Sequence, residues 1–150
     1  MQKKFIIGTD ISKNTIDAHC FGKPECLLIS NNIKGFKELL KWIKKQGCKD
    51  LKSVIIVMEY TGMYTYNFEN FLHDNQVDYV KRPALDIIRS SGIKRGKTDK
   101  ADAMMISKYG WYKREELKPM KPLNQSQLDL QQLMSYRDKL VADRHPINPG

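Results

Sequence analysis

The sequence predicts a mixed α/β domain in which helices flank a sheet of three antiparallel strands followed by parallel ones. Short apolar, β-branched runs recur through the first half of the chain, and after the third run they alternate with segments of helical periodicity. Such alternation requires crossover helices between parallel strands. At 150 residues and 41% hydrophobic content, the chain suits one ordinary domain with a substantial core.

The first three strands are expected to form an antiparallel meander. KFIIGTD (residues 4–10) reads as a buried strand with Asp10 at its end, and TIDAHCF (15–21) and ECLLIS (25–30) follow it. The glycine and proline of the intervening GKPE favour a turn.

Helices and strands then alternate. Residues 31–47 are predicted to form an amphipathic helix that stops at Gly47. SVIIVMEY (53–60) has the continuous apolar pattern of a central strand buried on both faces, and it ends on Glu59. The remaining segments are predicted to be a helix at 61–75, a strand at 77–81 and a helix at 83–92 with Pro83 at or near its first turn.

The last part of the chain is predicted to be helical. Thr98 is placed to cap a helix that begins at Asp99 and carries an apolar stripe of Ala103, Ile106 and Tyr109. A polar helix follows the break at KPMKP. We therefore expect one α/β domain at 1–118, a helical connector at 119–144 that is a possible start of a coiled coil, and a tail at 145–150.

Charge and cysteine content restrict the class of protein. The formal charge is +9, and between Lys81 and Lys100 seven basic residues face two aspartates. Such a patch favours a nucleic-acid partner, although a charged face can also serve solubility alone. Three cysteines without metal-ligand spacing fit a reduced cytoplasm, and no segment has the length of a membrane span.

Acidic residues stand at several predicted element ends. Asp10 and Glu59 end predicted strands, where sites form in α/β sheets. Asp99 and Asp102 would lie on one face of the following helix. Together the four carboxylates would repel one another unless a hard cation such as Mg²⁺ neutralised them, and Mg²⁺ is suited to phosphodiester chemistry.

Each of these residues also has a purely structural interpretation. Asp99 can stabilise a helix start through the helix dipole, and Asp10 can hydrogen-bond a turn. Asp102, one turn inside the predicted helix, is harder to explain in this way. Tyr60, Tyr64 and Tyr66 are interpreted as core residues in preference to base-stacking ones.

Three motifs together resemble a known family. GTDISKNTIDA, MEYTGMYTYNFENFL and GIKRGKTDKADAMMIS, in this order, resemble the N-terminal domain of the DEDD transposases of the insertion sequence 110 family, which includes pilin-gene invertases. The resemblance implies a ribonuclease H-like fold of the Holliday-junction-resolvase type. It matches Asp10, Glu59, Asp99 and Asp102 to the four acidic positions that bind Mg²⁺, for which Mn²⁺ is expected to substitute.

The resemblance also implies partners. DNA is the expected substrate, a structured bridge RNA the expected guide in the full-length protein, and a homo-oligomer through the C-terminal helix the expected assembly. Full-length members carry a second domain that supplies a serine, and we expect this chain to lack it. Candidate contacts to the nucleic-acid backbone come from the basic patch, on both sides of Asp99: Lys94, Arg95, Lys97 and Lys100.

Two alternative functions remain at this stage. A non-catalytic nucleic-acid-binding module would use the basic patch without any metal. An actin-like phosphotransferase fragment is suggested by GTDISKNTIDA, but the chain lacks the further glycine-rich phosphate turns of that class.

Overall fold

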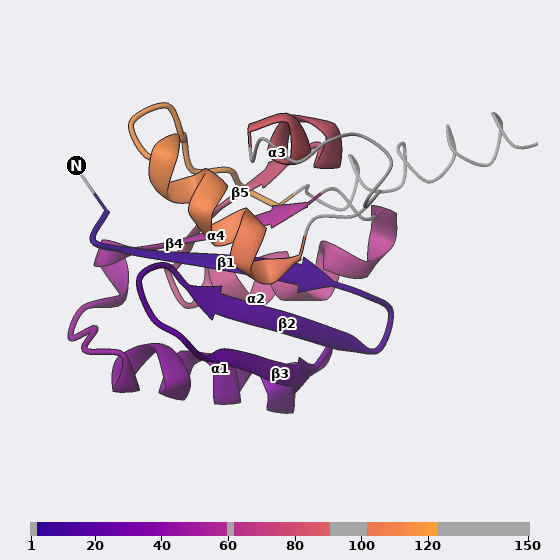
Figure 1. The fold of residues 1–150 in the computed structure, drawn as a ribbon. Helices are drawn as coiled ribbons and strands as arrows, with labels where there is room; N and C mark the ends of the chain where they lie inside the picture. Colours follow the sequence, from indigo (N-terminus) through magenta and orange to yellow (C-terminus); the bar gives the residue numbers. More distant parts are fainter. Residues whose placement is uncertain (1–2, 60–61, 91–101, 123–150) are drawn as a thin grey trace, which may run out of the picture.

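A computed structural model describes residues 3–59, 62–90 and 102–122, and its centre is one mixed sheet. The strands are β1 (Phe5–Ile11), β2 (Thr15–Cys20), β3 (Cys26–Ser30), β4 (Val54–Glu59) and β5 (Asp78–Arg82). They lie in the order β3-β2-β1-β4-β5 (Figure 1). The β1–β2 and β2–β3 pairs are antiparallel, and β4 pairs in parallel with both β1 and β5.

This topology confirms the predicted fold class. The three-stranded meander, the parallel strands that follow it and the flanking helices together form a ribonuclease H-like domain. Every residue of β4 is buried, as its continuous apolar run predicted, because this strand lies between two others and is covered on both faces.

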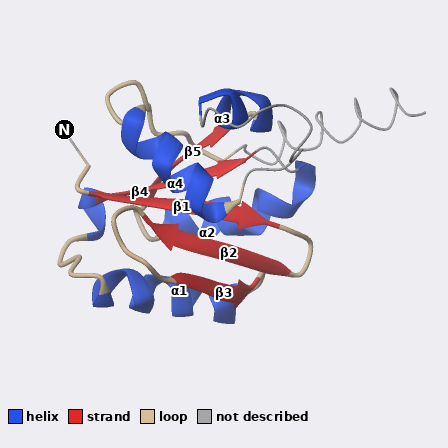
Figure 2. Cartoon of the chain, viewed as in Figure 1, coloured by secondary structure: helices blue, strands red, loops and turns tan. Residues whose placement is uncertain are grey.

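Helices connect the strands and cover the sheet. They are α1 (Ile33–Lys45), α2 (Tyr66–Asp74), α3 (Ala84–Ser90) and α4 (Ala103–Tyr112), with short 3₁₀ turns at Leu51–Ser53 and Gly62–Thr65. Figure 2 shows these helices in blue around the red strands. Within the described residues, no helix is long and apolar enough to span a membrane.

Local sequence signals set the limits of α1. The side chain of Asn32 accepts a hydrogen bond from the backbone N–H of Gly35 (2.9 Å) and so caps the first turn. After the helix, Gly47 has a φ of 99°, a conformation that favours glycine, which confirms the predicted stop.

Two hydrophobic clusters hold the layers together. On one face of the sheet, α1 and α2 bury Phe36, Leu39 and Phe68 against alternate residues of β1, β2 and β4. On the other face, Ile87 of α3 and Ile106 of α4 belong to a separate cluster with the intervening strand residues. Figure 1 shows α4 crossing in front of β1 on this second face.

Two predicted helix starts differ from the structure. The segment predicted as a helix over 61–75 is a 3₁₀ turn before α2 begins at Tyr66. The helix predicted from Asp99 begins at Ala103, and Asp102 has extended backbone angles (φ −85°, ψ 171°). The prediction that Asp102 lies inside a helix was therefore wrong, although the stripe of Ala103, Ile106 and Tyr109 is buried as expected.

Candidate active site

The parallel register of β1 and β4 brings Asp10 and Glu59 together. Thr9 is the register partner of Met58, so the next residues, Asp10 and Glu59, are neighbours at the ends of adjoining strands. Neighbouring residues in a sheet project to the same face. Long-range pairing thus joins two carboxylates that are far apart in the sequence.

Two further charged residues extend this pair into a row across the sheet. Asp17 of β2 is the register partner of Asp10, and Arg82 of β5 is the register partner of Glu59. The order across the sheet is therefore Asp17, Asp10, Glu59, Arg82, which we call the charged row. Asp17 is not among the predicted site residues, because only the β1–β2 register places it beside Asp10.

The charged row lies on the face of the sheet that α4 covers. Along β1, Ile6 belongs to the cluster on this face, and Gly8 and Asp10 follow at the two-residue period of a strand. Along β4, Ile55 and Val57 precede Glu59 in the same way. The row thus continues the surface on which α4 packs.

The glycine in β1 allows α4 to approach closely. A Cβ atom at Gly8 would stand 2.2 Å from the backbone nitrogen of Ser107 and 2.3 Å from the carbonyl oxygen of Ala103. At the other end of the helix, Gly110 lies against the side chains of Ile6 and Val57. The helix therefore runs opposite to β1, and its N-terminus points toward the end of the strand that carries Asp10.

A buried hydrogen-bond chain fixes α4 on β2. Nδ1 of His19 lies 2.6 Å from the hydroxyl oxygen of Ser107, and Nε2 of His19 lies 2.7 Å from the carbonyl oxygen of Lys23. Both side chains are buried. His19 is thus a structural residue, and it holds the helix that begins beside the charged row.

Asp102 stands at the start of α4. Its side chain accepts a hydrogen bond from the backbone N–H of Met105 (2.8 Å), which makes it the N-cap of the helix. The residue is exposed, whereas Glu59 is 7% exposed and Asp10 is intermediate. Asp102 therefore has a structural task that the sequence had suggested for Asp99.

Nearby negative charge affects the pKa of the Cys26 thiol. Partial burial raises the pKa of Cys26, and the carboxylates of Asp17 and Asp102 raise it further. Both carboxylates act on this one thiol, which lies at the start of β3. Two of the acidic residues thus share an electrostatic environment.

Several predicted site residues lie outside the described residues. These are Asp99 and all of the candidate backbone contacts: Lys94, Arg95, Lys97 and Lys100. Over the ranges that the structure describes, no three or more His, Cys, Asp or Glu side chains form a group able to hold a metal ion. The four-carboxylate metal site therefore stays a prediction.

The described residues of the basic patch differ in how far their charge is neutralised. Nζ of Lys81 lies 3.3 Å from the Glu69 carboxylate, which also accepts a hydrogen bond from the Thr65 hydroxyl (2.7 Å). Lys81 is therefore partly neutralised, whereas Arg89 on α3 is exposed.

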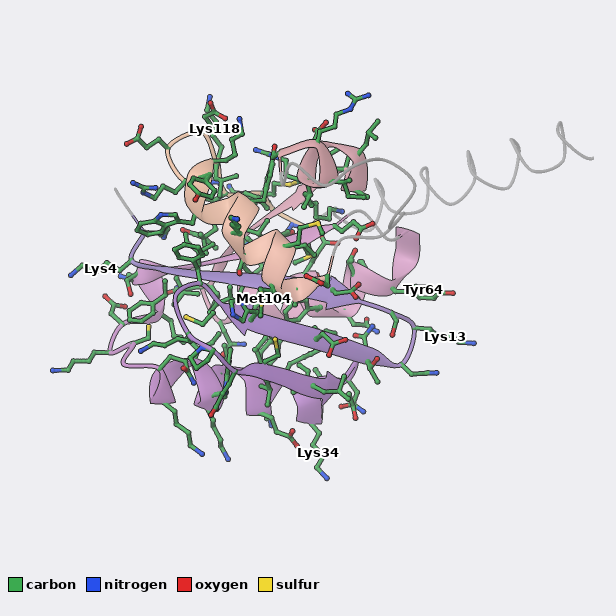
Figure 3. All side chains as sticks on the ribbon, in the orientation of Figure 1. Lys4, Lys13, Lys34, Tyr64, Met104 and Lys118 are labelled. Carbon is green, nitrogen blue, oxygen red and sulfur yellow. The ribbon has the colours of Figure 1, made fainter. Side chains whose placement is uncertain are left out.

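Tyr64 does not fill the core. Its side chain is 49% exposed and points away from the domain in Figure 3, so its interpretation as a core residue was wrong. Its carbonyl oxygen accepts a hydrogen bond from Nδ2 of Asn31 (3.0 Å).

The fold and the charged row define a ribonuclease H-like domain with acidic side chains at adjoining strand ends. A family model described as a transposase, of the DEDD type and the insertion sequence 110 group, matches residues 7–147. The chain therefore belongs to this transposase family.

Two relatives are similar along nearly the whole chain. They are the pilin gene-inverting proteins of Moraxella bovis and Moraxella lacunata, each 30% identical over 148 residues. The match covers 94% of this chain but 45% of each relative. The chain thus spans a little less than half the length of these curated relatives.

Proposed function

We propose that this chain is the catalytic portion of a transposase that recombines DNA with the help of a divalent metal ion. Membership of the transposase family supports the class of reaction. The observation that carries the proposal is the β1–β4 register, which makes Asp10 and Glu59 neighbours on the face where α4 begins.

The donor atoms in this region suit a hard cation. Asp10, Glu59 and Asp102 offer carboxylate oxygens only, and Mg²⁺ prefers oxygen ligands. Asp99 completes the proposed set, with Mn²⁺ as a substitute ion. When bound there, the metal would supply charge stabilisation for the attacking and leaving oxygens of a phosphodiester.

The protein's own residues position these carboxylates. One oxygen of Asp10 (Oδ1) and one of Glu59 (Oε2) are buried, so the sheet fixes the direction of both groups. The His19–Ser107 contact and the close packing at Gly8 hold α4, and with it Asp102, at the same edge. Fixed ligands of this kind lose little conformational entropy on metal binding.

Basic residues are the proposed contacts to the substrate backbone. Lys94, Arg95, Lys97 and Lys100 precede Asp102 closely in the sequence and would neutralise phosphates beside the carboxylates. Arg82, at the end of the charged row, adds a cation on the same face. A structured guide RNA, a homo-oligomer formed through the C-terminal helix, and action in the cytoplasm are further parts of this proposal.

Calorimetric titration of Mn²⁺ tests the metal site. The parent chain is compared with Glu59→Gln, which removes a proposed ligand, and with Asp86→Asn, which removes one charge on α3. We expect the parent and Asp86→Asn to bind Mn²⁺ and Glu59→Gln to lose most of the binding. If the parent binds no Mn²⁺, either alone or with duplex DNA present, the metal site is rejected.

A further variant, Asp10→Asn, distinguishes metal-dependent DNA binding from simple binding. A non-catalytic nucleic-acid-binding module would bind duplex DNA equally well in EDTA and would be insensitive to Asp10→Asn with Mn²⁺ present. We expect instead that Mn²⁺ strengthens DNA binding by the parent and not by Asp10→Asn. Equal binding by the two proteins in Mn²⁺ would favour the module.

A further inference from the structure

The outer surface of α1 carries a stripe of lysines that the carboxylate site does not use. Five lysines and one acidic residue, Glu38, lie on the exposed side of this helix. We call the five the lysine stripe: Lys34, Lys37, Lys41, Lys44 and Lys45. In Figure 3, Lys34 points away from the domain below α1.

The stripe is separated from the core-facing side of the helix. Gly35, Phe36, Leu39 and Ile43 are the buried positions of α1. The lysines recur at three- and four-residue spacing on the opposite side, so they share one surface. Because the apolar side of α1 is covered by the sheet and α2, the lysines are on the side of the helix that faces solvent.

Part of the lysine charge on α1 is unfavourable to the helix, although Glu38 lies four residues after Lys34 and the lysines of the last turn suit the helix dipole. Lys37, Lys41 and Lys45 follow one another at i, i+4, where like charges destabilise a helix. Lys34 lies in the first turn, where the helix dipole disfavours a cation, and no acidic residue stands there. The excess of five lysines over one glutamate gives this face a positive charge, which suits a polyanionic partner.

These lysines are also available. Among the ion pairs formed between described residues, none includes a member of the stripe. All five side chains are exposed. The lysine stripe therefore differs from Lys81, whose charge is partly used by Glu69.

We propose that the lysine stripe is a second nucleic-acid contact surface, which binds the phosphate backbone of a duplex on the face of the sheet opposite the carboxylates. The stripe spans roughly 16 Å from Lys34 to Lys45 at the α-helical rise. One strand of B-DNA carries a phosphate about every 3.4 Å along its axis, so the stripe spans about five phosphates. The choice of nucleic acid as the polyanion rests on the proposed function.

The position of the stripe implies a separate segment of nucleic acid. The sheet lies between α1 and the charged row, because α1 packs on one face and α4 on the other. A single short backbone segment therefore does not reach both. The domain would hold one segment at the carboxylates and a second one on α1.

Salt-dependent binding of labelled duplexes in EDTA tests this surface. The full chain is compared with the triple variant Lys34→Gln, Lys41→Gln, Lys45→Gln, since glutamine keeps the helix propensity of lysine. The matched control removes three exposed lysines elsewhere by Lys4→Gln, Lys23→Gln and Lys118→Gln. Duplex DNA and duplex RNA are measured in parallel, because both present the same phosphate chemistry.

The binding constant falls as salt rises, so the slope of log K against log salt is negative. We expect this slope to be less steep for the stripe variant by about 2.7, the value for three lost phosphate contacts. The control should keep the parent slope. Loss on DNA, on RNA or on both supports the proposal and identifies the source of the backbone.

Two results would overturn the proposal. One is a stripe variant whose slope equals that of the control on both duplexes. The other is a loss of binding to vesicles containing phosphatidylserine while duplex binding is retained, which would assign the stripe to an anionic membrane surface.

The test is independent of the metal site. In EDTA, adding Asp10→Asn to the stripe variant should not change the loss in slope. Failure of Mn²⁺ binding would reject the carboxylate proposal and leave this result intact. Circular dichroism of each variant checks that the fold is retained.

Discussion

The two faces of the central sheet differ in what their side chains do. The face under α1 and α2 is almost entirely apolar, and Phe36 there contacts the rings of Phe68 and Phe71 at centroid distances of 5.1 and 5.3 Å. The face under α4 begins with Ile6 and ends in the charged row. One face thus holds the larger buried apolar cluster, while the other ends in a cluster of charges.

The largest effect is expected on the apolar face. Phe36→Ala should lower the free energy of unfolding by about 4 kcal/mol, because it removes a fully buried ring and leaves a cavity. Urea denaturation measures the change. Leu28→Ala is the control, since Leu28 is 62% exposed and should cost less than about 0.5 kcal/mol. Similar losses for the two variants would contradict the assignment of the core.

The second largest loss of stability is expected where α4 packs closely on β1. Gly8→Ala should destabilise the chain by about 3 kcal/mol, because its new methyl group would overlap backbone atoms of Ser107 and Ala103. Gly110→Ala should cost less, since it meets side-chain methyl groups that can move. The same urea experiment compares them. A Gly8→Ala variant as stable as the parent would show that α4 shifts freely on the sheet.

Two substitutions of Asp102, the N-cap of α4, distinguish its capping role from the role of its charge. Asp102→Ala should lose about 1 kcal/mol of unfolding free energy, because the N–H of Met105 loses its side-chain acceptor. Asp102→Asn should keep most of this stability, since asparagine caps helices well. If Asp102 is also a metal ligand, both variants should weaken Mn²⁺ binding. Equal stability of the alanine variant and the parent would contradict the capping role.

The smallest effect concerns the thiol beside the acidic residues. Asp17→Asn should lower the pKa of Cys26, because it removes one of the negative charges that disfavour the thiolate. More thiolate at mildly alkaline pH should speed alkylation of Cys26, measured by peptide mapping across a pH series. Asp86→Asn, on α3, should leave the rate unchanged. Equal rates for the two variants would place Asp17 too far from Cys26 to affect it.

Much of the fold was predictable because its signals are local or periodic. The short apolar, β-branched runs, the continuous apolar run of β4 and the stop at Gly47 all act within a few residues. The start of α4 was not predicted correctly, since Thr98 and Asp102 are both good N-caps and composition alone does not choose between them. The exposure of Tyr64 was missed because tyrosine suits both a core and a surface.

Local signals in the sequence predicted only part of the candidate site. Asp10 and Glu59 were found because each follows an apolar run near the end of a strand, which is a local property; Asp10 is the last residue but one of β1, and Glu59 ends β4. Asp17 lies inside β2, where nothing in its neighbours marks it as part of a site. The second acidic pair was placed on one helical face, and the extended backbone of Asp102 shows that this geometry was wrong.

The sequence by itself determined the strands, the helices and the two acidic strand ends, because backbone propensity, capping and hydrophobic periodicity depend on residues close in the chain. Tertiary structure alone decided that Asp17, Asp10, Glu59 and Arg82 form one row, and that α4 starts beside it. Those arrangements depend on strand register and on the packing at Gly8, and each joins segments that only the folded chain brings into contact.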